Sequence, residues 1–154
     1  MDSLVFRKFS IDDLGLLGRW LKNSYIKKFW VEHEELISYV KDNLFYNEWI
    51  NYYIVEHGKP IGFVQFYETY KSPVGSFNPL NSESVAIDFM IGEEEFLNKG
   101  LGHSIVEELI RIIKSIGKYK YIISESCPKS IPFVKVLQRN GFEHIQNGIY
   151  ALKL

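Results

Sequence analysis

The alternation of apolar and polar residues changes period near residue 101, which predicts a strand followed by a long helix. Residues 84–91 are apolar and rich in β-branched side chains, as expected of a mostly buried strand. From there on, apolar residues recur at helical spacing, at Leu101, Ile105, Leu109, Ile112 and Ile116. Gly117 is suited to end this helix. The pattern therefore predicts a strand over 84–91 and a helix from Leu101 to Gly117.

The same patterning predicts further helices and strands on both sides of this pair. Helices are expected over about 10–21, where Ser10 and Asp13 form a capping box, over 33–45, and from 130 or 131 to Asn140. Strands are expected over 4–9, 51–56, 61–70, 120–125, 142–145 and 149–152, the last two joined by an Asn-Gly turn. The Pro- and Gly-containing segment 71–82 is expected to be a loop, long enough to be the rim or lid of a substrate site.

The junction Lys99-Gly100-Leu101-Gly102-His103-Ser104 is the first candidate for chemistry. A helix start presents unpaired N–H groups and partial positive charge, and two glycines let an anion approach without a Cβ in the way. Lys99 and His103 add cationic character. Two interpretations remain open, a diphosphate cradle and a simple tight turn into a helix. The P-loop and the dinucleotide-binding fingerprint are both absent from the chain.

Composition narrows the class of protein. The 154 residues are 46% hydrophobic with net charge −1, which indicates a globular chain, and the lack of a Lys/Arg block argues against nucleic acid as a partner. A single cysteine, Cys127, excludes an internal disulfide. The first residues lack a signal-peptide pattern and no apolar run reaches membrane-spanning length, so we expect a cytoplasmic protein without a membrane partner. The four histidines lack metal-ligand spacing, so no metal is expected.

Several stretches resemble one enzyme family. Asp88 in an Ile-Asp pair, Ile91-Gly92 and Leu97-Asn98-Lys99-Gly100-Leu101-Gly102 resemble the acetyl-CoA-binding motif of GNAT N-acetyltransferases, and more narrowly of aminoglycoside 6'-N-acetyltransferases. Trp20 to Asn23 with Lys28 to Trp30, and Pro60 to Tyr67, resemble two further stretches of that family. The resemblance covers most of the chain. It implies one GNAT acetyltransferase domain over 1–154 with an α/β (α+β) fold, in which helices flank a mixed, mostly antiparallel central sheet.

The resemblance also implies acetyl-CoA as the acetyl donor and coenzyme A as product. Pantetheine would lie along the strand that ends at Met90 and Ile91, and the diphosphate would lie over Asn98, Lys99, Gly100, Leu101, Gly102, His103 and Ser104. From the following helix the expected contacts are Ser130, Phe133 and Arg139. Lys135 and Arg139 could approach the 3'-phosphate, or lie on a solvated helix face.

The implied reaction is direct attack of a primary amine on the acetyl thioester. Asp88 corresponds to the family's base or ammonium-orienting residue, with a structural hydrogen bond as the alternative. The expected acceptor is a small amine, first of all the 6'-amine of an aminoglycoside, bound by a monomer or homodimer. Trp20 is expected in the core, and the run Glu93-Glu94-Glu95 is expected to be an exposed loop. The residues expected to bind substrate are Trp30, Tyr67, Glu68, Asp88 and Glu125.

The chain departs from the family pattern at the proton donor. Leu137 stands where many GNAT enzymes have the tyrosine that protonates the thiolate, and Phe89 stands where the family often has glutamine. Tyr67, Tyr70 and Tyr150 are candidate donors in its place. Leu137 also keeps open a non-catalytic acyl-CoA-binding regulatory module. An enzyme for another small amine or siderophore precursor, and a small interaction domain that binds nothing, stay open as well.

Overall fold

The computed structural model describes residues 3–28, 33–44, 47, 49–69, 83–125, 131–146 and 148–154. The side chains of residues 33, 34 and 131 are not among the described atoms. Five of the expectations above lie outside the described residues: the loop over 71–82, Trp30, Tyr70, Cys127 and Ser130.

Seven strands form one sheet in the order β1-β2-β3-β4-β5-β7-β6. They are β1 (Val5–Lys8), β2 (Ile50–Glu56), β3 (Pro60–Glu68), β4 (Ser84–Ile91), β5 (Tyr121–Glu125), β6 (Glu143–Gln146) and β7 (Ile149–Lys153). The pairs β1–β2, β5–β7 and β6–β7 are antiparallel, whereas β4 and β5 are parallel. The predicted mixed, mostly antiparallel sheet is confirmed.

The helices are α1 (Leu14–Leu21), α2 (Ser24–Lys27), α3 (His33–Asn43), α4 (Leu101–Ile116) and α5 (Ile131–Arg139), with short 3-10 turns η1 (Ile11–Asp13) and η4 (Glu94–Phe96). The predicted bounds of α4 and β4 are confirmed. Most other predicted elements are present with ends shifted by one or two residues. The first helix starts with a 3-10 turn, α2 is a short helix that was not predicted, and β3 ends two residues earlier than expected because residue 69 leaves the strand. None of the helices within the described residues is long and apolar enough to cross a membrane.

The chain divides into two compact units. Unit 1 comprises Met1–Gln65 and Phe89–Asn98, and unit 2 comprises Phe66–Asp88 and Lys99–Leu154. The expectation of one domain over residues 1–154 stays a prediction.

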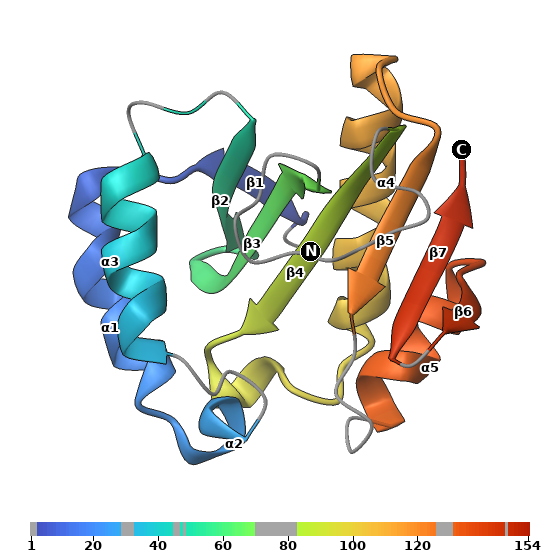
Figure 1. Ribbon diagram of the computed structural model, residues 1–154. Helices are drawn as coiled ribbons and strands as arrows, with labels where there is room; N and C mark the ends of the chain where they lie inside the picture. The colour runs from blue at the N-terminus through green and yellow to red at the C-terminus, as the bar shows by residue number, and fades with distance from the viewer. Residues whose placement is uncertain are drawn as a thin grey trace. The chain divides into compact units, whose positions relative to one another are not determined.

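In unit 1, α1 and α3 pack on each other, and the apolar side of α1 is buried (Figure 1). Trp20 is 1% exposed, which confirms its predicted place in the core. Phe9, Tyr52 and Phe63 form an aromatic cluster with ring centroids 5.7 to 6.4 Å apart. Each of these rings is at most 4% exposed, so their burial adds to the apolar core of this unit.

The predicted capping box at the start of η1 is confirmed, and it extends into an ion pair. The Asp13 carboxylate accepts a hydrogen bond from the Ser10 N–H at 2.8 Å and two from the Arg7 guanidinium at 3.0 Å. Burial alone would raise the pKa of Asp13, but the hydrogen bonds from Arg7 and Ser10 outweigh it and hold that pKa below its usual value.

Replacing Asp13 by Asn is therefore expected to lower the unfolding free energy by about 1 kcal/mol at pH 7, since a cap and a charged partner are lost. A carboxylate with a depressed pKa stabilises the fold above its unfolded-state pKa of about 3.9, and this contribution is lost as the pH falls through the folded-state pKa. The gap between the two proteins should therefore close below about pH 4. Urea unfolding at several pH values measures this, and a gap of equal size at pH 3 and pH 7 would contradict the prediction.

In unit 2, α5 packs against α4 (Figure 1). The side chains of Ile105, Val106, Leu109 and Ile113 are fully buried, as their helical spacing predicts. Ile116 was expected on the same stripe but is 47% exposed, because it is the last residue of the helix. Gly117 ends the helix with φ of 69°, which confirms its predicted role.

Candidate functional site

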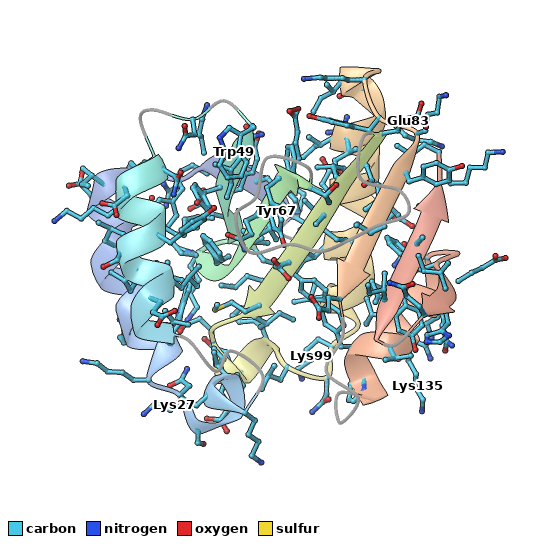
Figure 2. All side chains as sticks on the ribbon, in the orientation of Figure 1. Lys27, Trp49, Tyr67, Glu83, Lys99 and Lys135 are labelled. Carbon is cyan, nitrogen blue, oxygen red and sulfur yellow. The ribbon has the colours of Figure 1, made fainter. Side chains whose placement is uncertain are left out.

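The start of α4 is open to an approaching ligand. Gly100 is the N-cap residue with φ of 77°, a left-handed conformation that favours glycine, and Asn98 also has positive φ, at 60°. A Cβ built on Gly100 would meet no atom within 4 Å. Lys99 is exposed and lies beside the start of α4 (Figure 2). The space beside the Gly100 Cα is therefore open and lies next to a cation, which fits the approach of an anionic group such as a diphosphate to this helix start.

His103 lies in the first turn of α4, and it contacts Asn140, the residue that directly follows α5. Asn140 Nδ2 lies 3.2 Å from His103 Nδ1 and 3.4 Å from the His103 carbonyl oxygen. His103 Nε2 lies 3.6 Å from Glu107 Oε2. The sequence patterns pointed to His103 but not to Asn140, whose contact spans 37 residues along the chain.

The parallel ladder between β4 and β5 is short. Among the described residues it runs from Ser84–Tyr121 to Ala86–Ile123, although β4 continues to Ile91 and β5 to Glu125. Beyond the ladder, the Ser124 hydroxyl donates to the Ile87 carbonyl at 3.5 Å. The main chain around Asp88 and Glu125 thus lies just past the point where the ladder ends.

Three of the predicted substrate residues lie on one face of the unit 2 strands. Ala86 and Ile123 share a buried cluster with Ile149, and Tyr67 packs against it. Because side chains alternate along a strand, Asp88 and Glu125, two residues after Ala86 and Ile123, lie on the same face as this cluster. Asp88 is half-buried, Glu125 is exposed, and Tyr67 is half-buried. A hydroxyl and two carboxylates on one face are suited to bind ammonium groups.

Glu68 does not lie on the face that Tyr67, Asp88 and Glu125 share. It follows Tyr67 on β3, so it points to the opposite face, where Lys118 Nζ and the Tyr119 hydroxyl donate to its Oε2, both at 2.8 Å. The carboxylate is 2% exposed. Its predicted contact with substrate stays a prediction, and its observed partners give it a structural role.

Replacing Glu68 by Gln is expected to lower the unfolding free energy by about 2 kcal/mol, because a buried charge-assisted pair is broken. The KM for the acceptor amine should change by less than about twofold. Chemical denaturation and steady-state kinetics measure the two effects. An acceptor KM that rises tenfold without loss of stability would restore Glu68 to the substrate site.

Unit 1 contains a network that the sequence patterns did not reveal. The Gly92 carbonyl accepts hydrogen bonds from Asn23 Nδ2 at 3.0 Å and from the Tyr25 hydroxyl at 2.8 Å. The Trp20 indole donates to Glu93 at 2.8 Å. Burial raises the pKa of Tyr25, which keeps its hydroxyl a donor. The resemblance at Trp20 to Asn23 was the only available signal of this contact.

Two residues of the acidic run Glu93-Glu94-Glu95, which follows β4, form ion pairs within unit 1. Glu93 lies 3.6 Å from Arg19 Nη2, and Glu95 pairs with Lys59. Glu94 and Glu95 are exposed and Glu93 is half-buried, so the expected exposed loop is confirmed in the main. The run forms the short 3-10 turn η4.

The remaining predicted residues lie as follows. On α5, Phe133 is half-buried, and Lys135 and Arg139 are exposed; Figure 2 shows Lys135 on this helix. Leu137 is fully buried, so the side chain at the family's tyrosine place belongs to the core. On β4, Met90 is 4% exposed and Ile91 is half-buried. The described residues hold no group of three His, Cys, Asp or Glu able to bind a metal.

Comparison with known proteins identifies the family of the chain. A family model described as an acetyltransferase (GNAT) domain matches residues 11–148. The aminoglycoside N(6')-acetyltransferase type 1 of Klebsiella pneumoniae is 25% identical over 150 residues, covering 92% of this chain and 75% of that protein.

Solved structures share the fold. Aminoglycoside acetyltransferase AAC(6')-Ib in complex with coenzyme A matches with a TM-score of 0.86 at 21% identity, over 98% of this chain and 95% of that one. Spermidine N-acetyltransferase from Vibrio cholerae, in complex with coenzyme A and spermine, matches with a TM-score of 0.76 at 17% identity, over 97% of this chain and 95% of that one.

The chain belongs to the GNAT acetyltransferase family. It is therefore an N-acetyltransferase with acetyl-CoA as acetyl donor, related at low identity to the aminoglycoside 6'-N-acetyltransferases. The predictions of the fold, the enzyme class and the acetyl donor are confirmed.

Proposed function

We propose that the chain acetylates a primary amine of a small polycationic molecule, and specifically the 6'-amine of an aminoglycoside. The observation that carries the proposal is the shared face of Asp88, Glu125 and Tyr67 in unit 2. Two carboxylates on one face suit an acceptor with more than one ammonium group. The 25% identity to an aminoglycoside 6'-acetyltransferase supports the same acceptor.

The proposed contacts of acetyl-CoA follow from the open start of α4. The first N–H groups of α4, from Leu101 to Ser104, and the Lys99 ammonium bind the diphosphate. Gly100 leaves room for it, Gly102 adds no side chain to this turn, and Asn98 shapes the preceding turn. Phe133, Lys135 and Arg139 bind from α5, and on β4 the main-chain groups of Met90 and Ile91 bind the pantetheine amides. Ser130 lies outside the described residues, so nothing about it is added to this proposal.

The chemistry that acetyl-CoA supplies is an activated thioester, open to direct attack by an amine. The Asp88 carboxylate orients the acceptor's ammonium and takes its proton, so that the nitrogen lone pair can form the new C–N bond. After the attack the nitrogen loses its second proton to solvent, and as the C–S bond breaks a proton must reach the sulfur, so that the products are the amide and the free thiol. Leu137 cannot donate one. Tyr67 shares the face of Asp88 and is the proposed donor, whereas Tyr150 pairs with Ser124 on the opposite face.

Thiol release from acetyl-CoA, measured against a panel of amines, tests the proposal. The panel holds 4,6-linked aminoglycosides, polyamines and lysine peptides. We expect release with aminoglycosides, at a kcat/KM at least about tenfold above that for polyamines, because carboxylates that match several ammonium groups discriminate by about 1.4 kcal/mol or more. Release that is greatest with polyamines or peptides would contradict the acceptor. No release with any amine, while acetyl-CoA raises the melting temperature, would contradict the reaction.

A further inference from the structure

We propose that Asn140 is a positioning residue for acetyl-CoA and that it acts by fixing the His103 ring in the first turn of α4. The inference rests on the proposed function, because it concerns the helix start where the diphosphate is proposed to bind. Asn140 directly follows α5, and it lies within hydrogen-bonding distance of both the ring and the main chain of His103.

The partners of Asn140 identify the nitrogen end of its amide. Nδ2 lies 3.0 Å from the Val136 carbonyl oxygen and 3.4 Å from the His103 carbonyl oxygen. Both oxygens only accept hydrogen bonds, so the atom between them must donate. The same Nδ2 lies 3.2 Å from His103 Nδ1. Nδ2 carries two hydrogens, so one serves the Val136 carbonyl and the other is shared between the His103 carbonyl oxygen and Nδ1, which makes Nδ1 an acceptor.

This contact determines the tautomer of His103. A neutral imidazole carries one N–H, so an accepting Nδ1 places the hydrogen on Nε2. Nε2 lies 3.6 Å from Glu107 Oε2, and the His103 side chain is 37% exposed, so this N–H remains accessible from solvent. A fixed donor beside the free N–H groups of a helix start complements an anionic ligand.

The main chain at Asn140 and the two residues after it is fixed by hydrogen bonds to the last turn of α5. The Asn140 N–H reaches the Leu137 carbonyl at 3.0 Å, and the next two residues close the helix end through Gly141 N to Gln138 O at 3.0 Å and Phe142 N to Leu137 O at 3.1 Å. Leu137 and Phe142 are buried. A side chain held in this way orients the His103 ring at little further cost in conformational entropy.

Steady-state kinetics of Asn140→Ala test the inference. We expect the KM for acetyl-CoA to rise about fivefold to tenfold, the effect of losing about one hydrogen bond to a binding group, with kcat within about twofold. His103→Ala should raise KM by a similar factor. The double variant should have a KM no higher than His103→Ala alone, since Asn140 acts through that ring. Gln138→Ala, an exposed position on α5, is the control and should leave KM unchanged.

NMR of the imidazole nitrogens supplies a readout that a merely structural role would not move. In spectra recorded at pH 8.5, His103 should carry its hydrogen on Nε2. In Asn140→Asp, an isosteric variant whose carboxylate can only accept, the hydrogen should move to Nδ1. A hydrogen on Nδ1 in the unmodified protein, or the same tautomer in both proteins, would overturn the inference.

The kinetic outcomes separate the two proposals. A wild-type protein with no amine-dependent thiol release and no thermal shift with acetyl-CoA contradicts the proposed function. A wild-type protein that is active, with an Asn140→Ala variant of unchanged KM, overturns the role of Asn140 alone. The role of Asn140 is also overturned if the KM of the double variant rises by the product of the two single increases.

Discussion

Gly92→Ala is expected to destabilise unit 1 by about 3 kcal/mol, because the new methyl group has no room. A Cβ at this position would lie 2.2 Å from Cγ and Cδ2 of Trp20 and 2.5 Å from its Cδ1. Trp20 is 1% exposed and its indole donates to Glu93, so the ring cannot move without breaking that hydrogen bond and repacking its neighbours. Gly92 is thus required by the close approach of an aromatic ring.

Thermal and urea unfolding measure this effect, with Gly15→Ala as a matched control. A Cβ at Gly15, inside α1, would meet nothing within 4 Å, so that variant should be more stable by about 0.5–1 kcal/mol through helix propensity. Combining Gly92→Ala with Trp20→Leu should give a smaller loss than the sum of the two single changes, because the smaller side chain leaves room for the methyl group. A Gly92→Ala protein as stable as wild type would show that the ring moves freely.

Asp88→Asn is expected to lower kcat by at least about 100-fold, the usual contribution of a positioned acid or base. The amide keeps the shape of the side chain but loses the charge that orients an ammonium group and the ability to take its proton. The KM for acetyl-CoA should stay within about twofold, because the proposed cofactor contacts lie on α4, α5 and later residues of β4.

Kinetics with a saturating aminoglycoside and a thermal shift with acetyl-CoA separate the two effects. Asp12→Asn, an exposed acidic residue of η1, is the control and should have wild-type kcat. Unchanged turnover in Asp88→Asn would remove Asp88 from the mechanism and leave it a structural residue of β4. A loss of acetyl-CoA binding would assign it to the cofactor.

The elements that sequence predicted best are those whose pattern is local. The apolar strand β4 and the long amphipathic α4 carry their periodicity within one segment, and a glycine marks the end of the helix. Gly62 gives a physical reason for part of the stretch Pro60 to Tyr67 that resembles the family. A Cβ at Gly62 would lie 2.3 Å from the Met90 carbonyl oxygen, so this position has no room for a side chain. The short α2 has too few residues for a period to emerge.

The side-chain partners that sequence could not predict are those made over long separations. Tyr67 and Glu68 are neighbours in the sequence, and both were expected at the substrate site. The alternation of β3 sends them to opposite faces, and Glu68 meets Lys118, 50 residues away. Asn140 likewise reaches His103 only through the packing of α5 on α4. Such contacts depend on tertiary register, which a single sequence does not encode in any local pattern.

The β4–β5 ladder pairs the two strands over only part of their lengths. Both strands continue past Ala86 and Ile123, so within the described part of the chain the ladder stops before the strands do. Open strand edges recruit other extended chains, including those of misfolded neighbours. On the proposed function, the amide-bearing arm of acetyl-CoA lies along the end of β4, so the cellular supply of the acetyl donor would also protect the enzyme from aggregation and slow amide hydrogen exchange in this strand.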